Sequence, residues 1–129
     1  MSSDQSPVDA ETLDSLRELM EEEFPALVQS YLDDTHDILG KINDAIENGD
    51  NEELKLHAHA LKSSSANMGT LGVSGNAAEL ERLGKEGTTG NAAPLFDKVR
   101  EESARVRAVL ERELQTFCPG GRGSTRAAP

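Results

Sequence analysis

Two histidines, His57 and His59, lie two residues apart, and each has a side chain that could act as a nucleophile. A neutral imidazole keeps a nucleophilic ring nitrogen at physiological pH because its ordinary pKa is about 6.5. Lys62 follows His59 by three residues, which is close to one turn of a helix. A nucleophilic nitrogen beside a positive charge can accept a phosphoryl group, because that transfer needs mainly positioning and charge stabilisation.

The segment that carries these residues is predicted to be a helix from Asp50 or Asn51 to about Met68. On a helical wheel of about 100° per residue, one set of side chains gathers on a single side and must face the core. The members of this set are Leu54, Ala58, Leu61, Ser65 and Met68. His57 then lies about 60° from the core direction and His59 about 140° away on the other side. The two rings therefore cannot form one site, and His59 points outward.

The side chains around His59 on the wheel are cationic or small. The lysines supply charge for an incoming phosphoryl group, and the small side chains let another protein approach the imidazole. Leu56 lies about 60° from His59 and also outward, where a docked partner can contact it. Around His59 and Lys62, the predicted partner-binding surface comprises Lys55, Leu56, Ser63 and Ala66.

A carboxylate on the following helix is a candidate to orient His59. If the two helices pair about a turn centred near Thr70, position 81 faces position 59, and Glu81 occupies it. Its carboxylate would accept the Nδ1 proton of His59 and leave Nε2 free to attack. Glu79 and Arg82 are the neighbours that would replace Glu81 in a shifted register.

The run His59-Ala-Leu-Lys62-Ser-Ser-Ser-Ala-Asn-Met68-Gly69 resembles the motif of histidine-containing phosphotransfer (HPt) domains. The resemblance implies that His59 accepts a phosphoryl group and that Lys62 steadies its charge. Many members of that family also place an acidic or amide residue beside the histidine, which supports Glu81. One departure is Ser63, because the family commonly has Gly directly after the Lys. The hydroxyl keeps the surface small but adds a group where a partner would approach.

The remaining sequence predicts the helices that position this segment. Only 3% of the 129 residues are aromatic, and a core of Leu, Ile, Val and Ala favours helix-on-helix packing. Periodic apolar residues and turn signals predict helices over about 12–20, 24–48, 50–68, 73–86 and 94–117. Glu53 is expected to complete a capping box if Asp50 is the cap, and Ser103 is the weak place in the last apolar stripe. Short connections make consecutive helices antiparallel.

The predicted fold class is therefore all-α, an antiparallel four-helix bundle with a short additional N-terminal helix. The predicted organisation is a disordered N-terminus over 1–9, an HPt-like helical domain over 10–117 and a flexible tail over 118–129.

The charge is divided unevenly along the chain. Residues 1–53 carry 16 acidic and 2 basic side chains, and the formal net charge of the whole chain is −11. Because phosphate contacts dominate nucleic-acid affinity, an acidic chain without a basic groove is a poor candidate for that partner.

No run approaches the roughly 20 apolar residues that span a bilayer, and the start of the chain lacks a secretory signal pattern. The lone cysteine, Cys118, excludes an intrachain disulfide, so we expect a cytoplasmic protein without membrane contact.

The resemblance to HPt domains implies a phosphorelay intermediate that takes a phosphoryl group from a receiver-domain phospho-aspartate and passes it to another receiver. The resemblance implies as partners the receiver domains of a hybrid sensor kinase and of a response regulator, with Mg²⁺ held by the receiver. No Gly-rich nucleotide loop is present, so we expect a monomeric phosphocarrier without kinase activity or a cofactor of its own.

Two rival functions are compatible with the same residues. The first is a non-catalytic helical adaptor that binds a signalling partner through the same helix face. The second is a metal-binding bundle using His36, His57 and Asp33 or Asp37, although zinc usually requires a closed ligand set that the sequence does not show. His57 is predicted instead to be a half-buried histidine satisfied by hydrogen bonds, and His36 to be solvated.

Overall fold

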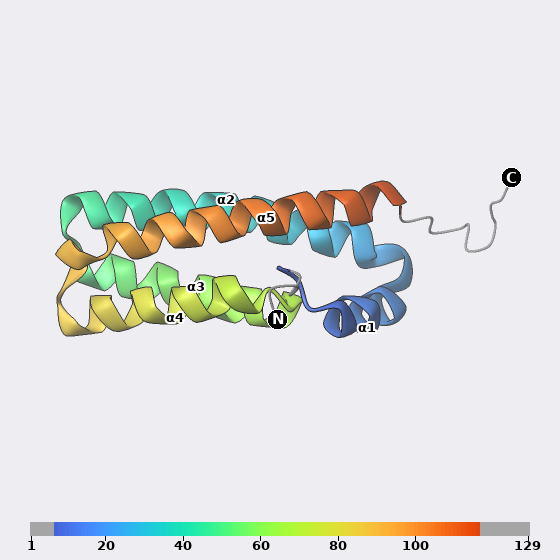
Figure 1. Ribbon diagram of the computed structural model, residues 1–129, viewed down its shortest axis with the longest axis horizontal. Helices are drawn as coiled ribbons and strands as arrows, with labels where there is room; N and C mark the ends of the chain where they lie inside the picture. The colour runs from blue at the N-terminus through green and yellow to red at the C-terminus, as the bar shows by residue number, and fades with distance from the viewer. Residues whose placement is uncertain (1–6, 117–129) are drawn as a thin grey trace, which may run out of the picture.

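The computed structural model describes residues 7–116, which form an all-α bundle and confirm the predicted fold class. A short helix, α1 (Ala10–Met20), leads through a 3₁₀ turn (Glu21–Glu23) into the bundle. The four long helices are α2 (Phe24–Asn48), α3 (Asn51–Met68), α4 (Leu71–Glu86) and α5 (Ala93–Thr116). Each of them runs antiparallel to the one before it (Figure 1).

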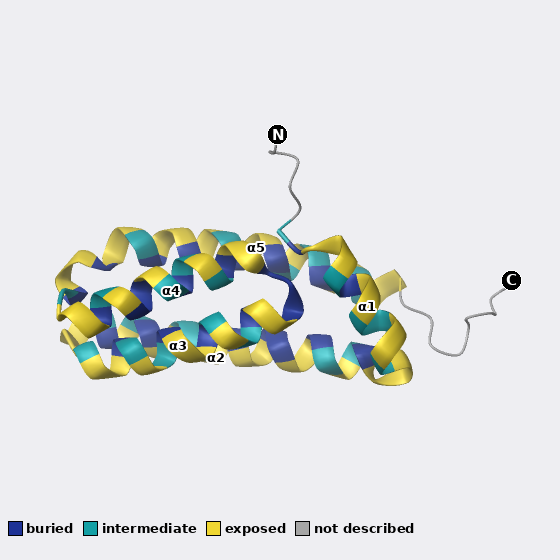
Figure 2. Ribbon diagram, turned by 90° about the horizontal axis from the view of Figure 1, so that it is seen from below, coloured by how far each residue is buried: buried dark blue, intermediate teal, exposed yellow. Residues whose placement is uncertain are grey.

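The helices form two layers, with α2 and α5 in one and α3 and α4 in the other (Figure 1). The α2 and α5 helices extend beyond α3 and α4, and α1 lies along this overhang as a continuation of the second layer. Figure 2 shows the buried residues on the inward sides of the helices. Every long helix contributes fully buried apolar side chains, including Phe24, Ile42, Leu54, Leu80 and Leu110. Each such side chain stabilises the fold by about 1.5–3 kcal/mol, so the common core fixes α3 and its outer face.

The N-terminal cap of α3 contains one of the two hydrogen bonds predicted for a capping box. The Asp50 carboxylate accepts a hydrogen bond from the Glu53 backbone N–H at 3.1 Å, which is the expected N-cap. The reciprocal bond of a capping box is absent, because the Asp50 N–H donates to the Ala45 carbonyl at 2.8 Å. The Glu53 carboxylate is therefore free to contact His57 instead.

The turn between α3 and α4 is shorter than predicted. Gly69 ends α3 in the left-handed conformation, with φ of 79°, and the Thr70 N–H donates to the Ser65 carbonyl at 2.9 Å. These contacts complete the reversal, so α4 begins at Leu71 rather than at Val73 and includes Gly72. The predicted loop after α4 holds a 3₁₀ turn, Thr89–Asn91.

The segment before α1 is tied to this turn. Asp9 caps α1 by accepting from the Thr12 N–H at 3.0 Å, so the helix begins at Ala10 and not at Thr12. The Asp9 N–H donates to the Gly69 carbonyl at 2.8 Å, and Val8 is buried. The disordered N-terminus predicted for 1–9 therefore does not include Val8 and Asp9. Residues 1–6, the predicted tail over 118–129 and the predicted helix end at Phe117 lie outside the described residues.

None of the helices within 7–116 combines the length and the apolar composition that a bilayer span requires.

Candidate functional site

His59 lies on the outer face of α3, and its side chain is 58% exposed. Its direction is set by the opposite face of the helix, where Leu54, Ala58 and Leu61 are fully buried in the core. Rotating the helix to hide His59 would expose these three side chains, so packing holds the imidazole toward solvent.

Glu81 on α4 connects the histidine to the lysine. Its Oε2 lies 3.0 Å from His59 Nδ1, and its Oε1 lies 2.9 Å from Lys62 Nζ. The Glu81 side chain is only 9% exposed, whereas that of Lys62 is 35% exposed. One buried carboxylate thus holds the imidazole and the ammonium group at the same time.

This contact determines which ring nitrogen of His59 is nucleophilic. The Lys62 ammonium lowers the pKa of Glu81 from its ordinary value, and the hydrogen bond from His59 acts in the same direction against the effect of burial. Glu81 is therefore ionised at neutral pH, and an ionised carboxylate can only accept hydrogen bonds. The proton must then be on Nδ1, which leaves the Nε2 lone pair of the neutral ring unprotonated.

A close approach of α3 and α4 allows Glu81 to reach both groups. A Cβ atom at Gly84 would lie 2.8 Å from the Lys55 backbone nitrogen and 2.9 Å from the Asn51 carbonyl oxygen, so only glycine fits there. Further along the pair, the Ser74 hydroxyl donates to the Lys62 carbonyl at 3.0 Å. These two contacts fix the spacing and the register of the helices on both sides of Glu81.

The other residues predicted around His59 all lie on the accessible part of α3. Leu56 is 57% exposed, and Ser63 and Ala66 are exposed. Lys55 pairs with Glu52 at 3.2 Å and remains partly exposed. This surface is open to a partner, as the wheel predicts, while the roles of its residues stay predictions.

The two neighbours considered in place of Glu81 do not contact His59. Arg82 pairs with Glu79 at 2.7 Å and with Glu86 at 3.0 Å, on the exposed side of α4. A residue that the sequence interpretation missed is Lys85, whose Nζ lies 3.7 Å from Glu81 Oε2. Its spacing of four residues after Glu81 was the available signal, because residues i and i+4 are neighbours on a helix.

The other histidines are separate from this cluster. His57 Nε2 lies 2.9 Å from Glu53 Oε1, and its side chain is 17% exposed. This is the half-buried, hydrogen-bonded state predicted for it. His36 is exposed on α2. Within residues 7–116, no three or more His, Cys, Asp or Glu side chains are grouped so that they could hold a metal ion.

Fold and site together define a phosphotransfer module, an antiparallel helical bundle that presents an oriented histidine. The sequence model of the Hpt domain family matches residues 26–116, and the chain belongs to this family. A solved structure similar to it is the histidine-containing phosphotransfer protein B (HptB) of Pseudomonas aeruginosa PAO1. The two chains are 32% identical, with a TM-score of 0.83 over 86% of this chain and 96% of that one. Comparison with the curated proteins gives no match.

Proposed function

We propose that His59 is the phosphoacceptor of this Hpt domain and that it relays a phosphoryl group between the aspartates of two receiver domains. The observation that carries the proposal is the bond between Glu81 and His59 Nδ1. It orients an exposed imidazole with Nε2 toward solvent, where an acyl phosphate of another protein can reach it.

The reacting nitrogen of His59, Nε2, carries no proton, so no proton has to leave it during the transfer. Nε2 of His59 attacks the phosphorus in line, the bond from phosphorus to the partner's aspartate oxygen breaks, and the Nε2–P bond forms. The aspartate leaves as a carboxylate, and the Nδ1 proton stays shared with Glu81. The positive charge of the substituted ring is then balanced by the ionised Glu81. The reverse attack by a second aspartate completes the relay.

Lys62 would steady the phosphoryl charge. It is held by Glu81 in the resting site but is partly exposed, so its flexible stem can turn the ammonium toward a phosphoryl group on Nε2. Lys85 is a second cation within 3.7 Å of Glu81, and it can take over as the partner of that carboxylate when Lys62 moves. Glu81 is thus a positioning residue, and it never contacts the transferred group.

The expected partners would supply the groups that this chain lacks. The receivers of a hybrid sensor kinase and a response regulator would dock over Leu56, Ser63 and Ala66, which surround His59 with a small and partly apolar surface. The receiver would supply Mg²⁺ and the phospho-aspartate, while this chain acts in the cytoplasm as a monomeric carrier without kinase activity or a cofactor of its own. The Ser63 hydroxyl stands beside the docking position and would contact the partner.

The test is incubation with a receiver domain carrying a radioactive phospho-aspartate, followed by separation of the two proteins. We expect label on the wild-type chain that is labile to acid and stable to base. His59→Gln should abolish it, and His57→Gln, a matched change two residues away, should not. Undiminished label on His59→Gln would refute the assignment of the acceptor. Binding of the receiver without any label on the wild type would instead favour a non-catalytic adaptor.

A further inference from the structure

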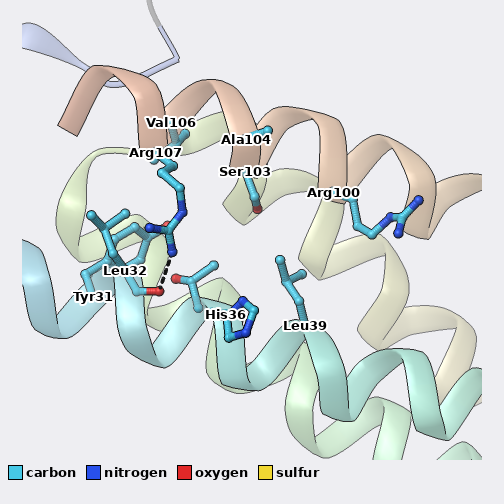
Figure 3. Close-up of a pocket in the computed structure, with 10 residues that line it drawn as sticks. Tyr31, Leu32, His36, Leu39, Arg100, Ser103, Ala104, Val106 and Arg107 are labelled. Atoms are coloured by element: carbon cyan, nitrogen blue, oxygen red, sulfur yellow. Dashed lines mark hydrogen bonds between the residues drawn. The ribbon is translucent and has the colours of Figure 1, made fainter. Parts of the chain in front are cut away.

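A cavity of about 240 Å³ lies between α2 and α5, and Figure 3 shows side chains that line it. These two helices form the layer opposite the α3–α4 pair that carries His59 (Figure 1). The cavity is far larger than the roughly 30 Å³ that one water molecule occupies in the liquid. Leu39 and Val106 form part of its apolar wall. Figure 3 shows Ser103 pointing from α5 toward α2, with His36 and Leu39 facing it from α2.

Two hydroxyl groups in this lining have no hydrogen-bond partner within the described chain. They are the hydroxyls of Thr35 and Ser103, which are only 7% and 9% exposed as residues. A buried hydroxyl without a partner is unfavourable, and most such groups in proteins are satisfied. Both residues line the cavity, so a small rotation of either side chain would let its unpaired hydroxyl donate to a bound molecule.

The cavity also has two cationic side chains on α5. Arg100 and Arg107 are each about one turn away from Ser103, so all three lie on one face of the helix. One terminal nitrogen of Arg107 donates to the Leu32 carbonyl at 3.2 Å, which holds the guanidinium at one end of the cavity (Figure 3). A guanidinium has five N–H donors, so Arg107 keeps donors for a ligand even with its ion pair to Glu111.

We propose that this cavity binds a small organic carboxylate, with its oxyanion on Arg107 and the two hydroxyls and its apolar body against Leu39 and Val106. Planar guanidinium groups and carboxylates form strong charge-assisted pairs. Apolar walls with a few convergent polar groups are the usual construction of a small-molecule site.

The charge around the cavity favours a monoanion over a dianion. The exposed acids Asp33, Asp34 and Asp37 lie on α2 beside the cavity residues, and the whole chain carries a formal charge of −11. The ion pairs of Arg100 with Asp97 and of Arg107 with Glu111 further limit the positive field. A carboxylate with one negative charge is repelled less by this surface than a phosphate ester with two.

The test is an NMR titration of the ¹⁵N-labelled full chain with sodium hexanoate at constant ionic strength. We expect saturable shifts of amides in 31–39 and 100–107, with a dissociation constant of about 1 mM, as suits so small a ligand. Hexanol and hexylammonium should bind at least about tenfold more weakly, because they lack the oxyanion. No saturable shift with hexanoate, or equal binding of hexylammonium, would overturn the proposal. Tighter binding of hexyl phosphate would overturn the preference for a monoanion.

Variants locate the binding in the cavity. Ser103→Leu fills the hollow and should remove the shifts, and Arg107→Gln should weaken hexanoate binding about tenfold. Arg105→Gln is the matched control, because Arg105 lies on the same helix, is 63% exposed and does not line the cavity. If Ser103→Leu does not fold, the partly exposed Arg107→Gln still decides, and an unchanged affinity in that variant would refute the site. Phosphotransfer is not involved, so failure here leaves the proposal for His59 intact.

Discussion

The α3–α4 and α2–α5 interfaces lie on opposite sides of one bundle. They differ in whether their buried polar groups have hydrogen-bond or ion-pair partners. At the first, the buried carboxylate of Glu81 is paired with His59, Lys62 and Lys85. At the second, the buried hydroxyls of Thr35 and Ser103 have no partner within the described chain, and a cavity separates the side chains around them. The same helical architecture thus produces one satisfied polar cluster and one unsatisfied one.

The difference follows from how closely the helices approach. Gly84 removes a side chain where α4 meets the backbone of α3, so the Glu81 carboxylate reaches across to α3. Between α2 and α5, the side chains of Leu39, Ser103 and Arg107 line the cavity (Figure 3). Close backbone contact therefore positions the carboxylate beside His59, and the α2–α5 interface contains a cavity.

The largest expected effect comes from breaking that close contact. Gly84→Ala places a Cβ atom against two backbone atoms of α3, so we expect the free energy of unfolding to fall by about 2 kcal/mol despite the better helix propensity of Ala. Gly75→Ala is the control, because no atom lies within 4 Å of its added Cβ, and it should raise stability by about 0.5–1 kcal/mol. Urea denaturation measures both changes. A stabilised Gly84→Ala protein would refute the close approach.

A smaller change in the free energy of unfolding should distinguish two buried serines, Ser65 and Ser103. The Ser65 hydroxyl lies 2.8 Å from the Tyr31 hydroxyl, so Ser65→Ala should lower the free energy of unfolding by about 1 kcal/mol. Ser103→Ala removes an unpaired hydroxyl and improves helix propensity, so it should be neutral or stabilising by up to about 1 kcal/mol. Equal losses in the two variants, measured by chemical denaturation, would show that Ser103 is satisfied after all.

The smallest effect concerns the pH dependence contributed by Glu81. Its folded pKa is lowered from 4.5, first by Lys62, so its stabilising contribution is fully present above pH 4.5 and is lost as the pH falls through the folded pKa. We expect Glu81→Gln to cost under about 1 kcal/mol at pH 7 and less near pH 3. Melting temperatures at the two pH values measure this, with the exposed Glu79→Gln as control. A cost that grows on acidification would reverse the sign of the inferred shift.

Local patterns were sufficient to predict much of the α3–α4 side. The wheel of α3 separates His59 from His57 because the core-facing residues fix the rotation of the helix, and the short turn fixes the register that brings Glu81 opposite. The start of α4 was predicted two residues late, because Gly72 was interpreted as part of the connection although a glycine can be accommodated in the first turn of a helix.

The α2–α5 cavity could not be predicted in the same way. The sequence indicates Ser103 as a weak place in an apolar stripe, but it gives no sign that the buried hydroxyl of Thr35 lines the same cavity. Whether two such hydroxyls pair or face a hollow depends on side-chain packing between helices distant in sequence. Lys85 was also missed, because its contact with Glu81 becomes informative only once Glu81 is known to face His59.

The bond between His59 and Glu81 also bears on the order in which the protein assembles. It joins residues 22 apart in the chain, whereas the bond from Arg107 to the Leu32 carbonyl joins residues 75 apart. Closing the longer loop costs about 1 kcal/mol more conformational entropy. The candidate site at His59 therefore belongs to a local helical hairpin, whose loop closes at a lower entropic cost. The cavity forms only when α5 pairs with α2, which are far apart in the chain.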